Sequence, residues 1–158
     1  MIRSTSKPLA VNGWNLFVHP LFLKQLGELT REVESLRSKN AETYRDKQAT
    51  KRLAAIRQLI FEIIPQDPTR TEYRQGKTLG TEHKHWFRAK FFQQYRLFFR
   101  YDLSNKVIIY AWVNDTKTLR AYKDKNDAYR VFKRMLNRGN PPDGWDELLA
   151  EAKTLPGV

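Results

Sequence analysis

The residues best suited to chemistry lie between Glu82 and Asp102, where the chain holds five basic side chains and no acidic one. They are Lys84, Arg88, Lys90, Arg96 and Arg100. An arginine binds phosphate through a planar fork of N–H donors, and a lysine among like charges can act as a base near neutral pH. RNA carries its own nucleophile, the 2′-OH, so a metal-free ribonuclease needs only groups that orient the phosphate, neutralise charge and move protons.

These residues occupy two predicted strands, 86–92 and 95–102, in which successive side chains point to opposite faces. If an odd-length turn such as 92–94 joins the strands, Lys90 lies opposite Arg96 and Arg88 opposite Phe98. The face then presents cations for phosphates and exposed aromatic rings for unstacked bases. The expected RNA-binding residues are Lys84, Trp86, Phe98 and Arg100. An even-length turn would instead place Lys90 opposite Leu97 and break up the basic face. The alternative to RNA binding is a sheet face that is basic only because it is exposed to solvent.

Other chemistries find less support. The pair His83 and His85 suggests a metal, but zinc needs at least three protein ligands and the remaining histidine, His19, is far away in sequence. We therefore expect no metal and no cofactor, and interpret the pair as loop residues without a catalytic task. The segment 76–78 resembles the end of a phosphate-binding loop, but the glycine required at position 71 is a threonine. No G-x-S-x-G nucleophile motif occurs.

The overall composition favours an anionic partner. The chain has 158 residues, which predicts one domain, and a net charge of +12. The absence of cysteine excludes disulfides and thiolate metal sites and fits a reducing compartment. We expect no membrane association, because no apolar stretch is long enough for a span, and no secretory signal follows the N-terminal Arg3 and Lys7.

The elements that must position the basic residues follow from hydrophobic spacing. We expect an arm over 1–10 and a single domain over 11–158, which begins with a strand over 14–18. Apolar stripes from Phe22 to Leu36 and from Ala49 to Ile63 predict two antiparallel helices, with a loop over 65–80 behind them. A fourth strand over 106–113, a helix over 127–138 and a short helix capped by Asp143 complete an α+β domain of order β-α-α-β-β-β-α plus a tail helix.

Several longer motifs carry a family resemblance. They run in order from Val11 to Trp145: VNGW, KQATKRLAA, GKTLG, YRLFFRY, TLRAY, DAYRVFKRMLNRG and PPDGW. In these segments the chain resembles the YhaV-type toxins, partners of PrlF-type antitoxins, within the RelE-like superfamily of ribonuclease toxins. The element order derived above is similar to the RelE-like fold, an antiparallel sheet with a paired helical hairpin and C-terminal helices.

The resemblance implies a bacterial, cytoplasmic endoribonuclease toxin that cleaves mRNA during translation on the ribosome and is neutralised by a PrlF-like antitoxin. It implies DNA binding only through the antitoxin complex. Its basic positions match Arg88, Lys90 and Arg96. Arg120 and Tyr122 of TLRAY match a further position of the site, where the spacing to the tyrosine differs from the RelE pattern. We expect Arg88 and Arg96 to hold the scissile phosphate and Lys90 to accept the 2′-OH proton. Tyr122 would protonate the leaving 5′-oxygen or stack on a base.

Two other functions stay open at this point. A basic domain could bind RNA, the ribosome or DNA without cutting it, and an inactive relative of the toxins could be retained only to bind an antitoxin. The sequence does not distinguish these from a ribonuclease.

Overall fold

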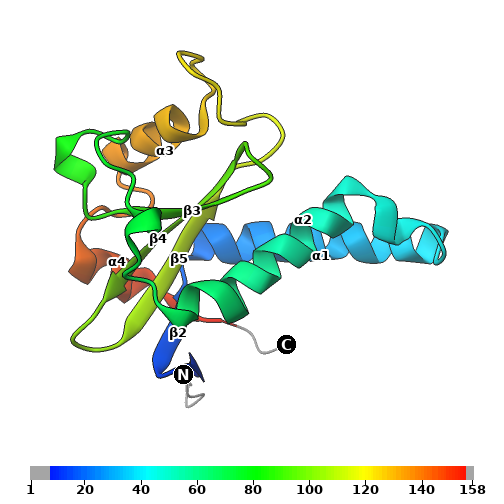
Figure 1. Ribbon diagram of the computed structural model, residues 1–158, viewed down its shortest axis with the longest axis horizontal. Coiled ribbons are helices and arrows are strands. Elements are labelled where there is room, and N and C mark those ends of the chain that lie inside the picture. Colours follow the sequence, from blue (N-terminus) through cyan, green and yellow to red (C-terminus); the bar gives the residue numbers. More distant parts are fainter. Residues whose placement is uncertain (1–7, 156–158) are drawn as a thin grey trace.

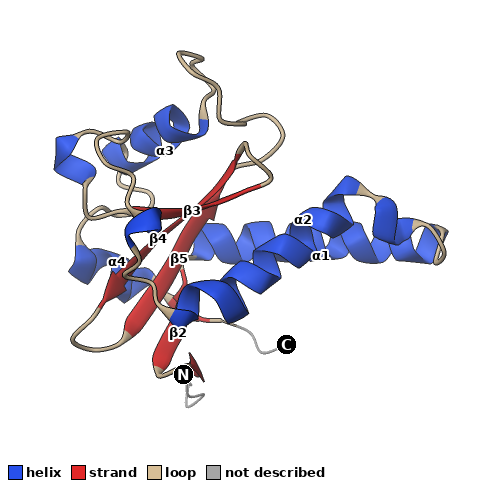
Figure 2. Ribbon diagram, in the orientation of Figure 1, coloured by secondary structure: helices blue, strands red, loops and turns tan. Residues whose placement is uncertain are grey.

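The computed structural model describes residues 8–155 as one six-stranded sheet covered by helices on both faces (Figures 1 and 2). The strands are β1 (Leu9–Val11), β2 (Trp14–Val18), β3 (Phe87–Phe91), β4 (Tyr95–Asp102), β5 (Val107–Val113) and β6 (Lys153–Thr154). Their order is β1-β2-β5-β4-β3, with β6 paired to β2. All pairs are antiparallel except β2 with β5, so the predicted α+β fold with a mainly antiparallel sheet is confirmed.

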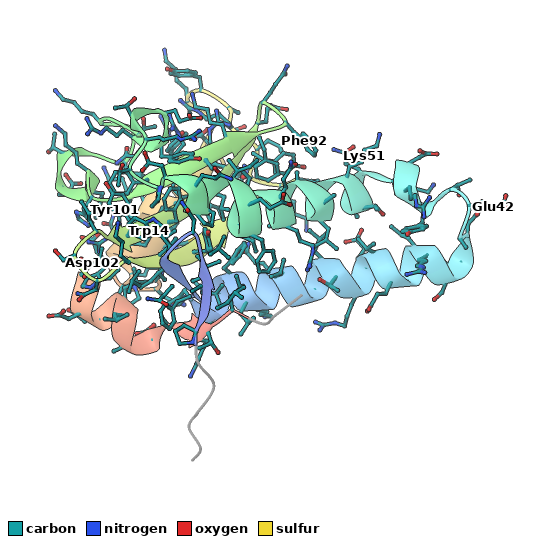
Figure 3. All side chains as sticks on the ribbon, turned by 60° about the horizontal axis from the view of Figure 1, so that its bottom comes forward. Trp14, Glu42, Lys51, Phe92, Tyr101 and Asp102 are labelled. Atoms are coloured by element: carbon teal, nitrogen blue, oxygen red, sulfur yellow. The ribbon has the colours of Figure 1, made fainter. Side chains whose placement is uncertain are left out.

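The two early helices form the predicted hairpin on one face of the sheet. Helix α1 spans Pro20–Lys39, and α2 spans Gln48–Gln58 and continues as a π-helical turn, Leu59–Ile63. Their apolar stripes, including Phe22 and Ile60, pack against Leu16 and other residues of the sheet. The connection between the helices lies far from the sheet, since Figure 3 places Glu42 at the opposite end of the molecule from Trp14.

The other face of the sheet is covered by α3 (Ala128–Asn137) and α4 (Trp145–Glu151). Phe132 of α3 stacks on Phe98 of β4 with 4.3 Å between ring centroids, and edge-on against Trp86 at 5.0 Å. Trp86 and Phe98 are therefore fully buried. The expectation that their rings are exposed on the basic face is wrong, because the apolar side of α3 needs an aromatic surface to pack on.

Two local predictions also differ from the structure. Of the expected arm over 1–10, residues 1–7 lie outside the described part, but Leu9 and Ala10 belong to β1. Asp143 was expected to cap α4, but the N-cap residue is Gly144, which has no side chain to cap the helix. The carboxylate of Asp143 is instead hydrogen-bonded to His83. Among the described residues, no helix is both long and apolar enough to cross a membrane.

Candidate active site

The turn between β3 and β4 decides which side chains share a face. It has three residues, Phe92 to Gln94, and the first two adopt positive φ values of 45° and 62°. Lys90 consequently pairs with Arg96 and Arg88 with Phe98, the register predicted for an odd-length turn. The three basic side chains lie on the face that α3 covers.

Arg88 and Arg96 converge on one hydroxyl group from that helix. The Nε atoms of Arg88 and Arg96 donate to the Tyr129 hydroxyl at 2.8 and 3.1 Å. Both arginines and the tyrosine are buried. A hydroxyl oxygen accepts two hydrogen bonds and donates one, so Tyr129 retains its own O–H for a further acceptor.

Main-chain carbonyls rather than carboxylates fix the two guanidinium groups. Arg88 donates from Nη1 to the carbonyl of Glu72 at 2.7 Å, and Arg96 donates from Nη1 to the carbonyls of Gln93 and Tyr95 at 2.7 and 3.0 Å. Within residues 8–155, neither arginine forms an ion pair. Buried cations without a counter-ion attract an anion strongly, because little water screens them.

Arg120 reaches the same tyrosine from the loop before α3. Its guanidinium carbon lies 4.7 Å from the ring centroid of Tyr129 and 4.4 Å from that of Tyr122, between the two rings. Its Nη1 donates to Asp127 Oδ1 at 2.8 Å. Tyr122 itself is 85% exposed, so its ring is available to a ligand. The structure therefore places Arg120 against Tyr129, whose hydroxyl Arg88 and Arg96 share, and places Tyr122 on the other side of Arg120.

Asp127, which was not among the predicted site residues, connects the loop before α3 to the start of that helix. One carboxylate oxygen accepts from Arg120 and from the backbone N–H of Ala121, and the other accepts from the N–H of Tyr129 at 3.0 Å. The same side chain thus caps α3 and positions Arg120.

Asn114 fixes the loop against the β3–β4 turn. Its side chain accepts from the N–H of Arg96 at 2.7 Å and donates to the carbonyls of Gln94 and Thr118 at 3.0 and 2.8 Å. The backbone N–H of Arg120 also donates to the Gln94 carbonyl. Arg96 and Arg120 therefore keep a fixed separation, as a phosphate-binding site requires.

The remaining predicted residues lie in two different environments. Lys90 and Lys84 are exposed, and Lys90 is the solvent-facing neighbour of Arg96. Arg100 is half-buried: it lies over the rings of Trp86 and Trp145 and donates to the Asp143 carbonyl at 2.6 Å. Burial lowers the pKa of Arg100, and Asp143 offsets part of that effect. Arg100, Trp86 and Phe98 form a packed layer rather than an exposed one.

Residues 83 and 85 lie beside an acidic partner that the sequence did not indicate. His83 Nδ1, His85 Nε2 and Trp86 Nε1 all lie 2.8–2.9 Å from one oxygen, Oδ1 of Asp143. Burial raises the pKa of this carboxyl, but the hydrogen bonds from Trp86, His85 and His83 lower it by more. His19 is elsewhere, bonded to Glu151 at 2.8 Å. The expectation that His19 is the only further metal-ligand candidate for His83 and His85 is therefore wrong, because Asp143 lies beside both.

Sequence reasoning missed Tyr129, Asp127 and Asn114 as members of the site. Tyr129 has a detectable signal, since it precedes Phe132 and Leu136 by three and seven residues and so belongs to the buried side of α3. Asp127 has the signal of a helix N-cap. Asn114 has no local signal, because its partners are set by the meeting of two loops.

Comparisons with known proteins identify the family of this chain. Residues 16–153 match the sequence profile of the YhaV toxin family, described as a toxin with endonuclease activity, of toxin-antitoxin system. The chain is 47% identical over 148 residues to the ribonuclease toxin YhaV of Escherichia coli K12, covering 92% of this chain and 96% of the relative. Toxin YhaV of Escherichia coli O6:H1 and that of O157:H7 match over the same share at the same identity. No solved structure matches significantly.

Proposed function

The chain belongs to the YhaV family of endonuclease toxins from toxin–antitoxin systems, and we propose that it is a metal-independent endoribonuclease that cuts mRNA. The observation that carries the proposal is the pair of buried guanidiniums, Arg88 and Arg96, which share the Tyr129 hydroxyl and have main-chain carbonyls as their other acceptors. Such a pair binds a phosphodiester in preference to a neutral ligand.

In the reaction, the RNA 2′-oxygen attacks the adjacent phosphorus, and the bond from phosphorus to the 5′-oxygen of the next nucleotide breaks. Arg88 and Arg96 hold the scissile phosphate and stabilise the extra negative charge of the pentavalent transition state. Their fixed hydrogen bonds mean that little reorganisation accompanies the charge development. The products are a 2′,3′-cyclic phosphate and a free 5′-OH.

Two protons move during this step. Lys90 is our candidate for the group that accepts the proton of the 2′-OH, because it is the exposed basic neighbour of Arg96 on the same face. The leaving 5′-oxygen needs a proton from a hydroxyl near the phosphate. Tyr129 has a free O–H between the arginines and is our candidate for this donor. The exposed Tyr122 ring would then stack on a base, held by Arg120.

The partners follow from the family. A PrlF-like antitoxin in the bacterial cytoplasm would mask the basic surface, and the antitoxin complex would supply DNA binding to repress the operon. The charge of +12 favours an antitoxin segment with acidic groups. Co-expression with the gene next to this one should restore growth, and toxicity that persists with each adjacent gene would contradict the antitoxin proposal.

The decisive experiment incubates the purified chain with end-labelled mRNA, free and on translating ribosomes. We expect cleavage in the presence of chelator, cyclic-phosphate ends, and no cut where the attacking 2′-OH is replaced by hydrogen. Arg88→Ala and Arg96→Ala should each lower the rate by about 100- to 1000-fold while circular dichroism stays unchanged. Lys133→Ala is the matched control, because the Lys133 ammonium lies 3.8 Å from Glu82 rather than among the arginines, and it should change mainly the salt dependence of binding.

Three outcomes would contradict the proposal. Wild-type rates in both arginine variants would place the centre elsewhere. Activity that is lost in chelator and restored by magnesium would contradict metal independence. Binding without any cleavage, on free RNA or on ribosomes, would leave a non-catalytic RNA-binding protein or an inactive relative.

A further inference from the structure

We propose that His83, His85 and Asp143 form a binding site for one divalent transition-metal ion, zinc foremost, which clamps the start of β3 to the turn before α4. One ligand atom from each residue lies within 4.8 Å of the other two. Two imidazoles and a carboxylate are ligands that zinc prefers, and three protein ligands with a water in the fourth position is a common arrangement. The site is separate from the arginines of the proposed active site.

The hydrogen bonds around Asp143 support a cation at this point. Three N–H groups, from His83, His85 and Trp86, approach a single carboxylate oxygen at 2.8–2.9 Å. Three such bonds crowd an oxygen that has two lone pairs. A metal ion relieves this crowding, because it replaces the two imidazole protons and binds both ring nitrogens and the carboxylate. The Trp86 N–H then keeps its acceptor.

The far side of the His83 ring gives a second, independent indication. Its Nε2 atom is buried and has no hydrogen-bond partner among the described residues, and Oε1 of Glu82 lies 3.8 Å away. With a proton on Nδ1, the bare lone pair of Nε2 faces this carboxylate. With a metal on Nδ1, the proton moves to Nε2 and points towards Glu82. A carboxylate behind a metal-bound imidazole is the usual outer partner of such a ligand.

Two of the three ligand separations are close to those of a coordinated ion, and the third, between the two ring nitrogens, is within 4.8 Å. Zinc–nitrogen and zinc–oxygen bonds of about 2.0–2.1 Å in a tetrahedron place neighbouring ligand atoms about 3.3 Å apart. The nitrogen–oxygen separations of 2.8 and 2.9 Å need to open by only about half an ångström. His85 is partly exposed, with its side chain at 37% of full exposure, so an ion and a bound water can enter from that side.

The position of the site indicates a structural role. His83 and His85 lie in the segment that leads into β3, and Trp86, which follows them, packs on Phe132 of α3. Asp143 immediately precedes the cap of α4. A bound ion therefore ties together the entry to β3 and the C-terminal helices, and it stabilises the fold without touching the phosphate site.

The test uses the full chain without an affinity tag, stripped of metal by a chelator that is then removed, and titrated with Zn²⁺ by calorimetry. We expect one ion per chain, and a rise in Tm of about 5–10 °C at a free metal concentration about 100-fold above Kd. Co²⁺ in the same protein should give the visible absorption of a tetrahedral nitrogen–oxygen site. His85→Ala and Asp143→Asn should abolish both signals, whereas Lys84→Ala, in the same segment, should keep them.

The proposal fails if the wild-type chain takes up no Zn²⁺, or if His85→Ala and Asp143→Asn both still bind one ion. Because Asp143→Asn could disturb the Trp86 contact, the exposed His85→Ala variant and the Co²⁺ spectrum of the wild type decide the matter independently. RNA cleavage at a temperature well below Tm is expected to be the same with and without Zn²⁺. Metal binding and metal-independent catalysis can therefore fail separately.

Discussion

The hydroxyl of Tyr129 lies 2.8 Å from Nε of Arg88, which joins a residue of an edge strand to the first turn of a helix 41 positions later. This contact makes α3 part of the proposed active site rather than only its cover. Tyr129→Phe should lower RNA cleavage by about 10- to 100-fold, because the two guanidiniums lose their common acceptor and the leaving 5′-oxygen loses its proposed proton donor. Single-turnover cleavage rates and circular dichroism measure this. Tyr44→Phe, in the distant helical hairpin, is the control, and equal rates in the two variants would rule out a positioning role for Tyr129.

The pairing of Arg120 with Asp127 gives a second prediction. Asp127→Asn removes the charge but keeps an oxygen that can cap α3, so the fold should survive. We expect weaker RNA binding and slower cleavage, because Arg120 loses the ion pair that holds it between Tyr122 and Tyr129. Asp127→Ala should in addition cost about 1 kcal/mol of unfolding free energy, owing to the lost cap. Urea denaturation of both variants separates the two effects, and identical stabilities would argue against the cap.

Strand register was the part of the site best predicted from sequence. The alternation of basic and apolar residues, together with an odd-length turn, placed Lys90 opposite Arg96 and Arg88 opposite Phe98, and the structure confirms both pairs. Side chains alternate between the two faces along a strand. A turn of three residues therefore fixes which side chains of the two strands lie on the same face.

The layer above that face was not predicted, although the information was present. The apolar side of the helix at 128–137 requires an apolar surface to pack on. The aromatic side chains of β4, such as Phe98, form that surface. The hairpin of β1 and β2 also had a signal, since Asn12-Gly13, with φ values of 51° and 83°, is a typical two-residue turn. The third ligand-type residue near His83 and His85 had none, because Asp143 is 58 residues from His85 in the chain.

Asn114 provides a test of how strongly the loops are held. Asn114→Ala removes three hydrogen bonds and leaves the N–H of Arg96 and the carbonyl of Thr118 without these partners, whereas the carbonyl of Gln94 keeps the N–H of Arg120. We expect a loss of about 2–4 kcal/mol in unfolding free energy, because each buried polar group left unsatisfied costs about 1–3 kcal/mol and water satisfies part of the set. Chemical denaturation measures the loss. Asn126→Ala, in an exposed loop, should change stability by less than about 0.5 kcal/mol.

Tyr110 predicts instability in alkaline solution. Its hydroxyl is buried and donates to the carbonyl of Ile60 at 2.7 Å; burial, and to a smaller extent Tyr73, raises its pKa well above the usual 10.0. The folded chain keeps this group neutral, whereas the unfolded chain ionises it at about pH 10. Its contribution to stability is therefore complete below that pH and is lost as the pH rises towards the folded-state pKa.

The measurement compares unfolding free energies at neutral pH and above about pH 10. Tyr110→Phe should be less stable than the wild type at neutral pH by about 1 kcal/mol, because a buried hydrogen bond is lost, yet it should lose less stability on going to alkaline pH. Tyr44→Phe should follow the wild type. Parallel pH curves for the wild type and Tyr110→Phe would show that Tyr110 does not govern alkaline unfolding.

The contacts of Asp127 and Tyr129 also determine when a growing chain could become active. Arg88 and Arg96 emerge from the ribosome first, but their shared hydroxyl and the anchor of Arg120 belong to the start of α3, and α3 packs in one cluster with Leu148 of α4. A partly synthesised chain that ends before these helices has the basic strands without the groups that fix them. The proposed phosphate site can therefore assemble only after α3 and α4 have been synthesised, so a nascent chain that ends before α3 is not expected to cut RNA on the ribosome that is making it.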